Sequence, residues 1–352
     1  MTSIPINYTT PEQQIIKLKK QNLIIEDEEN AKRKLQIYGY SNLIKSYREP
    51  YVVTNGNEKS YRSGVTFNQI ESLYLLDKAL RNAMMAAMQD LEEHIKESTA
   101  DVLAKTFGTH QDEYLNFKNF RDKKKTKKRF SLGYILTTLR DMLQTDKYPI
   151  HHYSTKYGTV PPWILLKSAY FSTIVNFISL FKVPEQENLC RLLYDLSEDE
   201  FGINTLRMLM MDTLFICVDY RNKAAHGGRI YNYKCSSTLR VDKLSNIILP
   251  MEPGLGQFLY LLSLLKYPAP YKRLKSVLDK EVNRHCNRFP QDVTYLGQIL
   301  NMNIVSKEYV FVSPNSNKYH TTPHCSGLHD ALKLEKEEAE QNQFVPCKRC
   351  FK

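Results

Sequence analysis

The sequence predicts a mainly α-helical protein, in which a helical bundle is followed by a small module with a β-hairpin and a helix. Apolar residues recur every three or four positions over most of the 352 residues, the spacing of helices that bury one face. Near the end the pattern changes, because Tyr309–Val312 and a polar turn at 314–318 are typical of a strand and a hairpin. The composition, 42% hydrophobic and 25% charged, is that of a globular protein.

The helical patterns follow one another along the chain. Residues 51–65 are expected to form a loop or hairpin, after which Thr66 and Gln69 have the pattern of a capping box. The strongest helical pattern comes next, because apolar residues recur from Ile70 to Ile95 over about seven turns. The predicted helices span residues 11–24, 28–48, 70–95, 163–181, 185–196, 198–225, 254–266, 269–285 and 289–302.

Local composition limits where the protein acts. The longest uncharged apolar stretch, residues 168–181, is too short to span a membrane, and the first fifteen residues lack the pattern of a secretory signal. Seven cysteines, three of them in the last 28 residues, favour a reducing compartment with a local metal site. We therefore expect a cytoplasmic protein without membrane contact. Its expected parts are a helical domain at 1–235, a helical extension at 236–304 and a zinc module at 305–352.

The charge of the chain favours a polyanionic partner. Lys and Arg (49) outnumber Asp and Glu (38), which gives a net charge of +11 and a pI near 9.1. Seven basic residues and one acidic residue lie between Arg121 and Arg129, and Phe120 and Phe130 flank them as stacking surfaces. A solvated loop without a function is the simpler interpretation, but we favour binding to the phosphate backbone of RNA. The residues expected to bind there are Lys123, Lys124, Lys125, Lys127, Lys128 and Arg129.

The stretch from Arg221 to Asn232, RNKAAHGGRIYN, has the residue types for cutting RNA without a metal. When the 2′-hydroxyl attacks the neighbouring phosphorus, the reaction needs a base, an acid and cations for the developing negative charge. Histidine can supply the acid and the base, and arginine the cation. Five residues of helix separate Arg221 and His226 by about 140°, so one copy makes a poor site. We therefore predict a homodimer that surrounds one phosphate with both copies of these residues.

The simpler interpretation is that Arg221 pairs with a carboxylate and that His226 only ends the helix. The wider sequence argues against it, because it resembles the HEPN superfamily, whose signature is Arg, a polar residue and His at this spacing. More narrowly it resembles the Abi-like branch, the abortive infection proteins of AbiD and AbiF type, in which RN-x-x-AH precedes an Arg and an aromatic-Asn pair. The matching residues are Arg221, Asn222, Ala225, His226, Arg229, Tyr231 and Asn232.

This resemblance covers roughly residues 10–235. The Tyr38-Gly39-Tyr40 segment, the helix with Asp77 and Arg81, and the Pro162-Trp163 helix entry fall in the family's order. One position departs from the pattern, because the family often has Glu four residues after the Trp and this chain has Lys167. Glu92 or Glu93 is a candidate for the acid that orients Arg221.

The resemblance implies a HEPN-like helical bundle that works as a dimeric endoribonuclease, without a catalytic cofactor, in phage defence or a toxin–antitoxin pair. Arg221 would hold the scissile phosphate, and His226 would be the general base or acid. Asn222 would position the backbone or the phosphate, and Arg229 would extend the anion site. An antitoxin or a small-RNA regulator would be a further partner.

The end of the chain has the spacing of a zinc site. A Cys347-x-x-Cys350 pair follows Cys325 by more than twenty residues, and a His before Cys325 completes four ligands. We expect His320 to be that ligand, with His324 as its competitor. The stretch resembles the small zinc module related to the Ada metal-binding domain, and four protein ligands imply a structural ion. Leu328, Ala331, Leu332 and Ala339 are expected on a short helix between the ligand pairs.

Two other functions compete with the nuclease. One is a non-catalytic RNA-binding or sensor protein of a defence system, in which Arg221 and His226 shape an anion pocket. The other is an interaction protein held inactive by a partner. An RNA digest with a chelator present identifies the nuclease, since only a nuclease loses cleavage when Arg221 or His226 is replaced. RNA binding without a difference in cleavage favours the RNA-binding protein, and association with neither RNA nor DNA at low salt favours the interaction protein.

Overall fold

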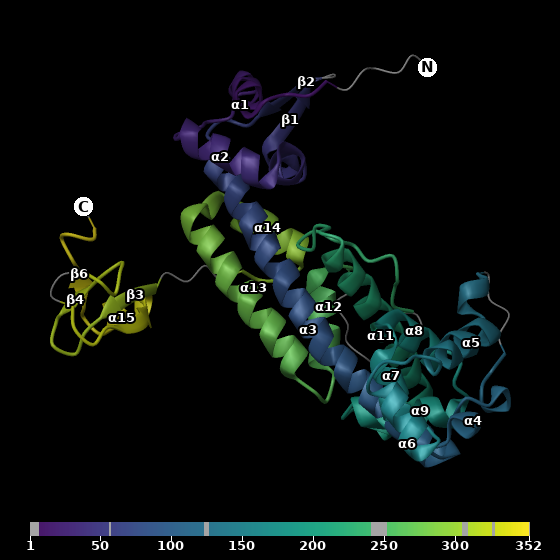
Figure 1. Cartoon of the computed structure of the whole chain (residues 1–352). Helices are drawn as coiled ribbons and strands as arrows, with labels where there is room; N and C mark the ends of the chain where they lie inside the picture. Colours follow the sequence, from purple (N-terminus) through teal and green to yellow (C-terminus); the bar gives the residue numbers. More distant parts are fainter. Residues whose placement is uncertain are drawn as a thin grey trace. The chain divides into compact units, whose positions relative to one another are not determined.

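The computed structural model describes residues 7–55, 58–122, 127–240, 252–304, 309–325 and 328–351, and Figure 1 shows their course. These residues are mainly helical, as the sequence predicts, and their short strands pair in twos. They form two compact units. The first consists of Met1–Leu76, Leu278–Gln298 and Met302–Lys352, and the second of Asp77–Val277 and Ile299–Asn301.

The bounds of the elements are as follows. The helices are α1 (Pro11–Lys20), α2 (Glu28–Tyr38), α3 (Phe67–Phe107), α4 (Gln111–Tyr114), α5 (Leu132–Met142), α6 (Ile150–Tyr157), α7 (Pro162–Ser168), α8 (Phe171–Ile178), α9 (Val183–Leu193), α10 (Glu198–Phe201), α11 (Ile203–Ala225), α12 (Leu255–Ser263), α13 (Ala269–Arg288), α14 (Val293–Leu300) and α15 (Lys336–Gln341). Shorter turns are η1 (Ser41–Lys45), η2 (Glu49–Tyr51), η3 (Phe117–Asn119), η4 (Lys128–Phe130) and η6 (Pro290–Asp292). The strands are β1 (Val52–Asn55), β2 (Glu58–Tyr61), β3 (Tyr309–Val312), β4 (Lys318–Tyr319), β5 (Leu332–Glu335) and β6 (Val345–Pro346).

The first unit begins with two helices and the hairpin that the sequence predicts. Thr10 and Gln13 cap the start of α1 reciprocally. Gly39, with a φ of 78°, ends α2, so the helix predicted over 28–48 is broken before η1. β1 and β2 then pair antiparallel, with Val52 opposite Tyr61.

Helix α3 is longer at both ends than its apolar pattern predicts, and it contributes to both units. The Thr66 hydroxyl accepts the backbone N–H of Gln69 and caps the helix. The Gln69 side chain instead donates to Asp292 at 2.9 Å. The predicted apolar positions from Ile70 to Ile95 are buried.

A buried polar network joins α3 and α13 within the first unit. The two ring nitrogens of His285 lie 2.9 Å from the Ser72 hydroxyl and 2.9 Å from Asp292, whose carboxylate also accepts the Tyr51 hydroxyl. These residue types match a hydrolytic triad, but Ser72, His285 and Asp292 are all buried. We therefore assign the network to packing, where each buried polar group finds a partner.

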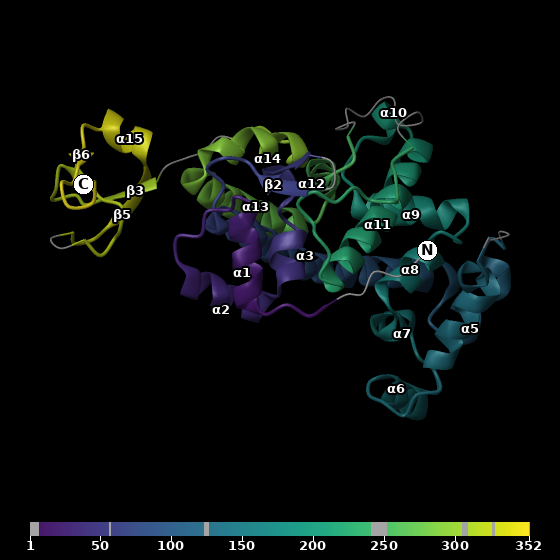
Figure 2. The same cartoon turned by 90° about the horizontal axis from the view of Figure 1, so that it is seen from above.

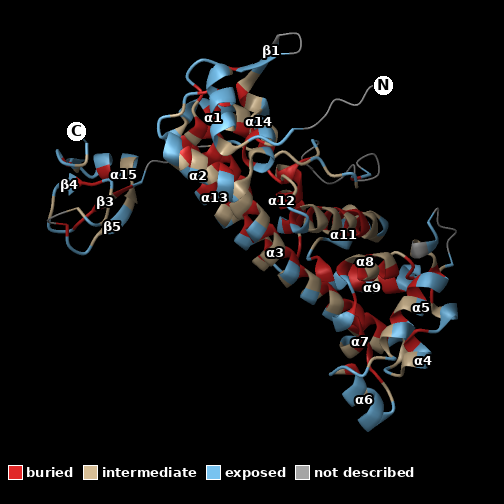
Figure 3. Cartoon of the chain, turned by 45° about the horizontal axis from the view of Figure 1, so that its top comes forward, coloured by how far each residue is buried: buried red, intermediate tan, exposed pale blue. Residues whose placement is uncertain are grey.

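The second unit holds the helices around α11. Figure 2 shows α8 and α9 beside α11, which also contacts α12. Two helices that the sequence predicts in this unit, at 163–181 and 198–225, are each divided into two helices in the structure. Ala169 and Tyr170 are extended and separate α7 from α8, and Gly202, with a φ of 76°, separates α10 from α11. Figure 3 shows the buried residues gathered on the inner faces of these helices.

Residues 309–351 form a module with its own small core. β3 pairs antiparallel with β5, β4 pairs parallel with β6, and Phe311 bridges to His320. The core consists of Val310, Val312, Tyr319 and Ala339. The short helix expected between the ligand pairs is α15, which contains Ala339, whereas Leu332 begins strand β5. The expectation was wrong for Leu328, Ala331 and Leu332, which lie before α15, because apolar residues at this spacing fit a short strand and its approach as well as a helical turn.

No helix among the described residues combines the length and the apolar character needed to cross a membrane.

Candidate functional site

The site predicted from the sequence lies where α11 ends. His226 is the C-cap of the helix, and its backbone N–H bonds back to Asn222 at 3.1 Å. Gly227 follows in the left-handed conformation, with a φ of 69°, which favours glycine over any side chain. Gly228 passes against the Lys223 side chain, so closely that a Cβ would lie 2.6 Å from it. The double glycine therefore turns the chain sharply and leaves His226 exposed.

A buried carboxylate on α3 holds the loop that follows. Asp77 is fully buried, and one of its oxygens accepts the backbone N–H groups of Ile230 and Tyr231, each at 2.8 Å. Its other oxygen lies 2.7 Å from the Arg81 guanidinium. Hydrogen bonds to an ionised carboxylate are about twice as strong as neutral ones. Asp77 therefore fixes the direction in which the chain leaves His226.

Two further carboxylates, both on α11, hold the residues that come next in the chain. Asp219 accepts hydrogen bonds from Tyr233, Cys235 and Ser236. Burial raises the pKa of Asp219, but these hydrogen bonds, led by that of Cys235, outweigh it and lower the pKa overall. Arg240 then pairs with Asp212 at 2.7 Å. The chain from Ile230 to Arg240 is thereby anchored beside the helix that carries Arg221.

Arg221 points into a cavity of about 680 Å³ in the second unit. Its Nη1 donates to the Asn222 side chain at 3.4 Å, and no carboxylate lies within 4.0 Å of it in the described part of the chain. It is only partly buried. A guanidinium without a carboxylate partner is available to bind an anion.

The cavity joins Arg221 to the acidic face of α3. Glu92, Glu93 and His94 line it from α3, and Lys167 lines it from α7. Glu92 is paired with Lys96 at 2.8 Å, so it does not pair with Arg221. Glu92 and Glu93, the candidates for the acid that orients Arg221, thus line the same cavity as Arg221, and among the described residues neither forms an ion pair with it.

His94 was not selected from the sequence, although it shares this cavity. Burial lowers the pKa of His94 below its ordinary value, and its Nε2 has no hydrogen-bond partner among the described residues. Its ring lies 5.0 Å from that of Tyr267. A neutral imidazole beside an unpaired guanidinium is a further candidate for proton transfer. No sequence signal distinguishes this His from a core residue, because it stands in an ordinary helical pattern.

The other predicted binding residues have different surroundings. Lys127 and Lys128 are exposed, whereas Lys123, Lys124 and Lys125 lie outside the described residues, as does the side chain of Arg129. Arg229 is partly buried in the loop held by Asp77. Phe120 is not a stacking surface, because it is buried against Phe177 and Phe181.

The four predicted metal ligands come together in the C-terminal module. One ligand atom of each of His320, Cys325, Cys347 and Cys350 lies within 4.8 Å of all the others. The Cys350 Sγ and the His320 Nδ1 are 3.8 Å apart. Ligands about 2.0–2.3 Å from a tetrahedral zinc ion are separated by similar distances. His324 is exposed and is not in the cluster found among the described residues.

The donor chemistry of this cluster fits a structural zinc ion. Three thiols and one imidazole fill all four positions of a tetrahedral site and leave none open for a substrate. The backbone N–H groups of Arg349 and Cys350 lower the pKa of the Cys347 thiol, which favours the thiolate that a metal requires. Hydrogen bonding with Cys350 raises the pKa of Cys325 to about 11.

These features define a class of mainly helical protein. It has an arginine and a histidine at the end of a central helix, and a Cys/His cluster near the C-terminal end of the chain. The chain matches the family of Abi-like proteins over residues 33–232, more than half of its length, and belongs to that family. The resemblance inferred from the sequence is thus confirmed at the level of the family, which takes its name from abortive infection, a defence against phage. No characterised protein and no solved structure matches the chain.

Proposed function

We propose that this protein is a HEPN-type endoribonuclease that cuts RNA without a metal ion at a site built by two copies, in phage defence or a toxin–antitoxin system. The observation that carries the proposal is the state of Arg221. Its guanidinium faces a cavity of about 680 Å³ with no carboxylate partner among the described residues, five positions before an exposed His226. A partly buried guanidinium held in this way is available to bind a phosphate.

The reaction follows from these residue types. One His226 removes the proton of the 2′-hydroxyl, and the oxygen attacks the adjacent phosphorus. Arg221 stabilises the negative charge that develops on the phosphorane oxygens, as cationic donors do in phosphoryl transfer. The bond to the 5′-oxygen breaks, and a second imidazole donates a proton to that leaving oxygen. The products are a 2′,3′-cyclic phosphate and a free 5′-hydroxyl.

The need for two copies follows from the geometry of α11. The helix is regular through Ala225, so the side chains of Arg221 and His226 point about 140° apart. One chain therefore offers the phosphate an arginine or a histidine, but not both from one side. A two-fold axis beside the end of α11 brings the missing group from the second copy.

Three residues around Arg221 have supporting roles in this proposal. Lys167 adds positive charge where the family often has a Glu, and it lines the same cavity as Arg221. Glu93 lines it as well and is the acid we propose to orient Arg221 when RNA is bound. Asn222, already 3.4 Å from Arg221, positions the guanidinium or the phosphate.

The test is an RNA digest in EDTA with the wild type, Arg221→Ala and His226→Ala. Arg33→Ala and His152→Ala, at exposed positions on α2 and α6, are the matched controls. We expect cleavage to fall about 10²–10⁴-fold in the two site variants and to be unchanged in the controls. A substrate with 2′-deoxy nucleotides should resist cleavage completely.

Two results would contradict the proposal. Cleavage that stops in EDTA, or that proceeds on the 2′-deoxy substrate, excludes 2′-hydroxyl attack without a metal. If RNA binds but neither wild type nor control cuts it, the protein is the RNA-binding or sensor protein that the sequence left as the alternative.

A further inference from the structure

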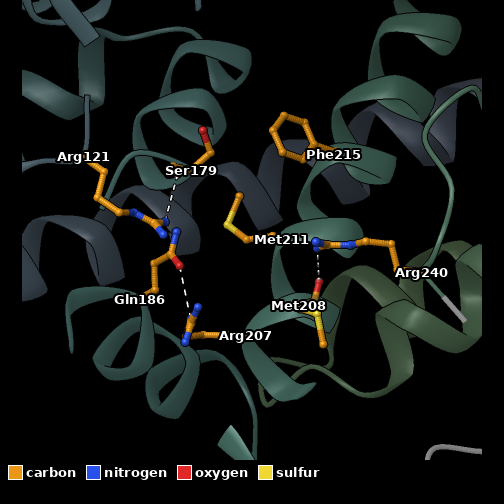
Figure 4. A pocket seen from close by; sticks show the side chains of 8 residues that line it. All are labelled: Arg121, Ser179, Gln186, Arg207, Met208, Met211, Phe215 and Arg240. Atoms are coloured by element: carbon orange, nitrogen blue, oxygen red, sulfur yellow. Dashed lines mark hydrogen bonds between the residues drawn. The ribbon is translucent and has the colours of Figure 1, made fainter. Parts of the chain in front are cut away.

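Another cavity in the second unit is cationic, and it lies against the N-terminal part of α11. It has a volume of about 220 Å³, and Figure 4 shows the side chains that line it. Arg121, Arg207 and Arg240 contribute three guanidinium groups, and Met208, Met211 and Phe215 contribute an apolar wall. The cavity shares no residue with the one at Arg221. Arg207 precedes Arg221 by fourteen residues, which is about 21 Å along the helix.

Arg121 carries an unpaired charge in this cavity. Its Nη2 donates to the backbone oxygen of Ser179 at 3.3 Å, and its backbone N–H bonds to Leu180. Its Nε is buried without a hydrogen-bond partner, and no carboxylate lies within 4.0 Å of its guanidinium among the described residues. Burial lowers the pKa of Arg121, and the charge of Arg207 adds to this effect. An unpaired buried charge is unfavourable in the absence of an anion.

Arg207 is held toward the same space. Its Nε donates to the Gln186 side chain at 3.3 Å, and its Nη1 donates to Asn204 at 2.7 Å. The nearest carboxylate, that of Glu187, is 4.0 Å away and also faces Arg191. In Figure 4 the Gln186 amide lies between the guanidinium groups of Arg121 and Arg207. The fold thus places two positive charges near each other, and among the described residues no carboxylate closer than that of Glu187 neutralises them.

The third arginine has a different role. Arg240 is neutralised by the bidentate contact with Asp212, at 2.7 and 3.1 Å. Together with Met208, Met211 and Phe215 it forms the side of the cavity away from Arg121 (Figure 4). One end of the cavity is therefore cationic and the other is apolar with an aromatic ring. A ligand that matches both ends has an anion attached to a flat organic ring.

We propose that this cavity binds the phosphate monoester of a nucleotide, with the phosphate at the cationic end that Arg121 and Arg207 line and the base against Met211 and Phe215. Charge-assisted hydrogen bonds from two guanidinium groups suit a phosphate, and aromatic rings stack on bases. The volume is below the roughly 300–1,000 Å³ of sites that enclose whole drug-sized ligands, so part of the nucleotide stays outside. The ligand is either a free nucleotide or the 5′-phosphorylated end of an RNA.

The position of Arg121 in the sequence fits the second source. It is the first of the seven basic residues that end at Arg129, and a run of positive charge in the sequence is typical of a chain that binds the phosphates of a nucleic acid. The site does not depend on the nuclease, because none of its residues belongs to the site at Arg221.

The experiment measures binding in the full-length His226→Ala variant, so that RNA stays intact. Two pairs of probes are compared. The first pair is one ten-nucleotide RNA with either a 5′-phosphate or a 5′-hydroxyl, and the second pair is AMP and adenosine. We expect the phosphate to increase affinity about tenfold to hundredfold in at least one pair, and Arg121→Met and Arg207→Gln to remove this difference. An effect confined to RNA assigns the site to RNA ends, and one confined to AMP assigns it to free nucleotides. If neither pair differs, the proposal is wrong.

A stability measurement excludes a merely structural role for Arg121. Replacing an unpaired, partly buried charge by Met should leave the melting temperature unchanged or raise it, whereas loss of a structural contact would lower it. Arg33→Met, at an exposed position on α2, is the control and should keep the preference for the phosphate. If Arg121→Met is too unstable to measure, the charge is structural and Arg207→Gln alone decides whether a phosphate binds.

Discussion

At the scale of single residues, the loop after His226 depends on the buried carboxylate of Asp77. Two backbone N–H groups and the Arg81 guanidinium are among the donors that converge on it. Removing the carboxylate would take this acceptor away from Arg81 and from the N–H groups of Ile230 and Tyr231, two residues that are buried. Unsatisfied buried groups of this kind are among the few causes of large stability losses from single substitutions.

Asp77→Ala should therefore lower the free energy of unfolding by about 3–5 kcal/mol, the range for breaking a buried ion pair by removing one partner. Denaturant unfolding followed by circular dichroism measures it. Asp101→Ala is the matched control, since this Asp also stands on α3 and pairs with a Lys four residues later, but both partners are exposed. It should change stability by no more than about 1 kcal/mol. Equal losses in the two variants would show that Asp77 does not hold the loop.

From the sequence we predict which residues form this site, but not which atoms they contact. Arg221 and His226 follow from residue type and spacing, and so do the four metal ligands that the structure gathers. Asp77 stands out only through the family resemblance, because the backbone N–H groups that it binds lie more than 150 residues away. The three arginines of the second cavity belong to different helices and loops, and no local pattern relates them.

At the scale of elements, apolar periodicity predicts where helices lie but not where they break. The pattern over 163–181 continues through the extended residues Ala169 and Tyr170, because Phe171 and Ile174 are buried on the far side of the break. Gly202 interrupts 198–225 in the same way. Periodicity reports which side chains are buried, and a chain that turns between two short helices can bury the same side chains as one that does not.

The C-terminal module yields a prediction at this scale, because its core of four buried residues is too small to hold residues 309–351 together alone. Purified protein should contain one zinc ion per chain, measured by atomic spectrometry. His320→Ala should lose the ion and make the module sensitive to protease, whereas His324→Ala, the matched control, should keep it. Chelation should release the ion without reducing RNA cleavage. Retention of zinc in both variants would place the ion elsewhere.

At the scale of the whole molecule, one chain holds the parts of the proposed nuclease but not the complete site. Arg221 faces a cavity, His226 is exposed at the end of α11, and the regular helix between them turns their side chains apart. The sequence predicts this division, because the angle between two positions of a helix is fixed by their spacing. It cannot predict which surfaces of two copies meet, since that depends on the shape of residues that are distant along the chain.

A mixing experiment tests the division directly. Arg221→Ala and His226→Ala should each be inactive alone, but equal amounts refolded together should recover part of the cleavage, because half of the dimers then carry one Arg221 and one His226 at the shared site. The mass in solution, measured by light scattering, should be twice 41.1 kDa for each variant and for the mixture. The double variant mixed with wild type is the control for simple dilution. If the two inactive variants form dimers and recover nothing, then either each chain works alone or the shared site needs both copies of Arg221 or of His226, and the prediction that one residue of each kind restores part of the cleavage is wrong.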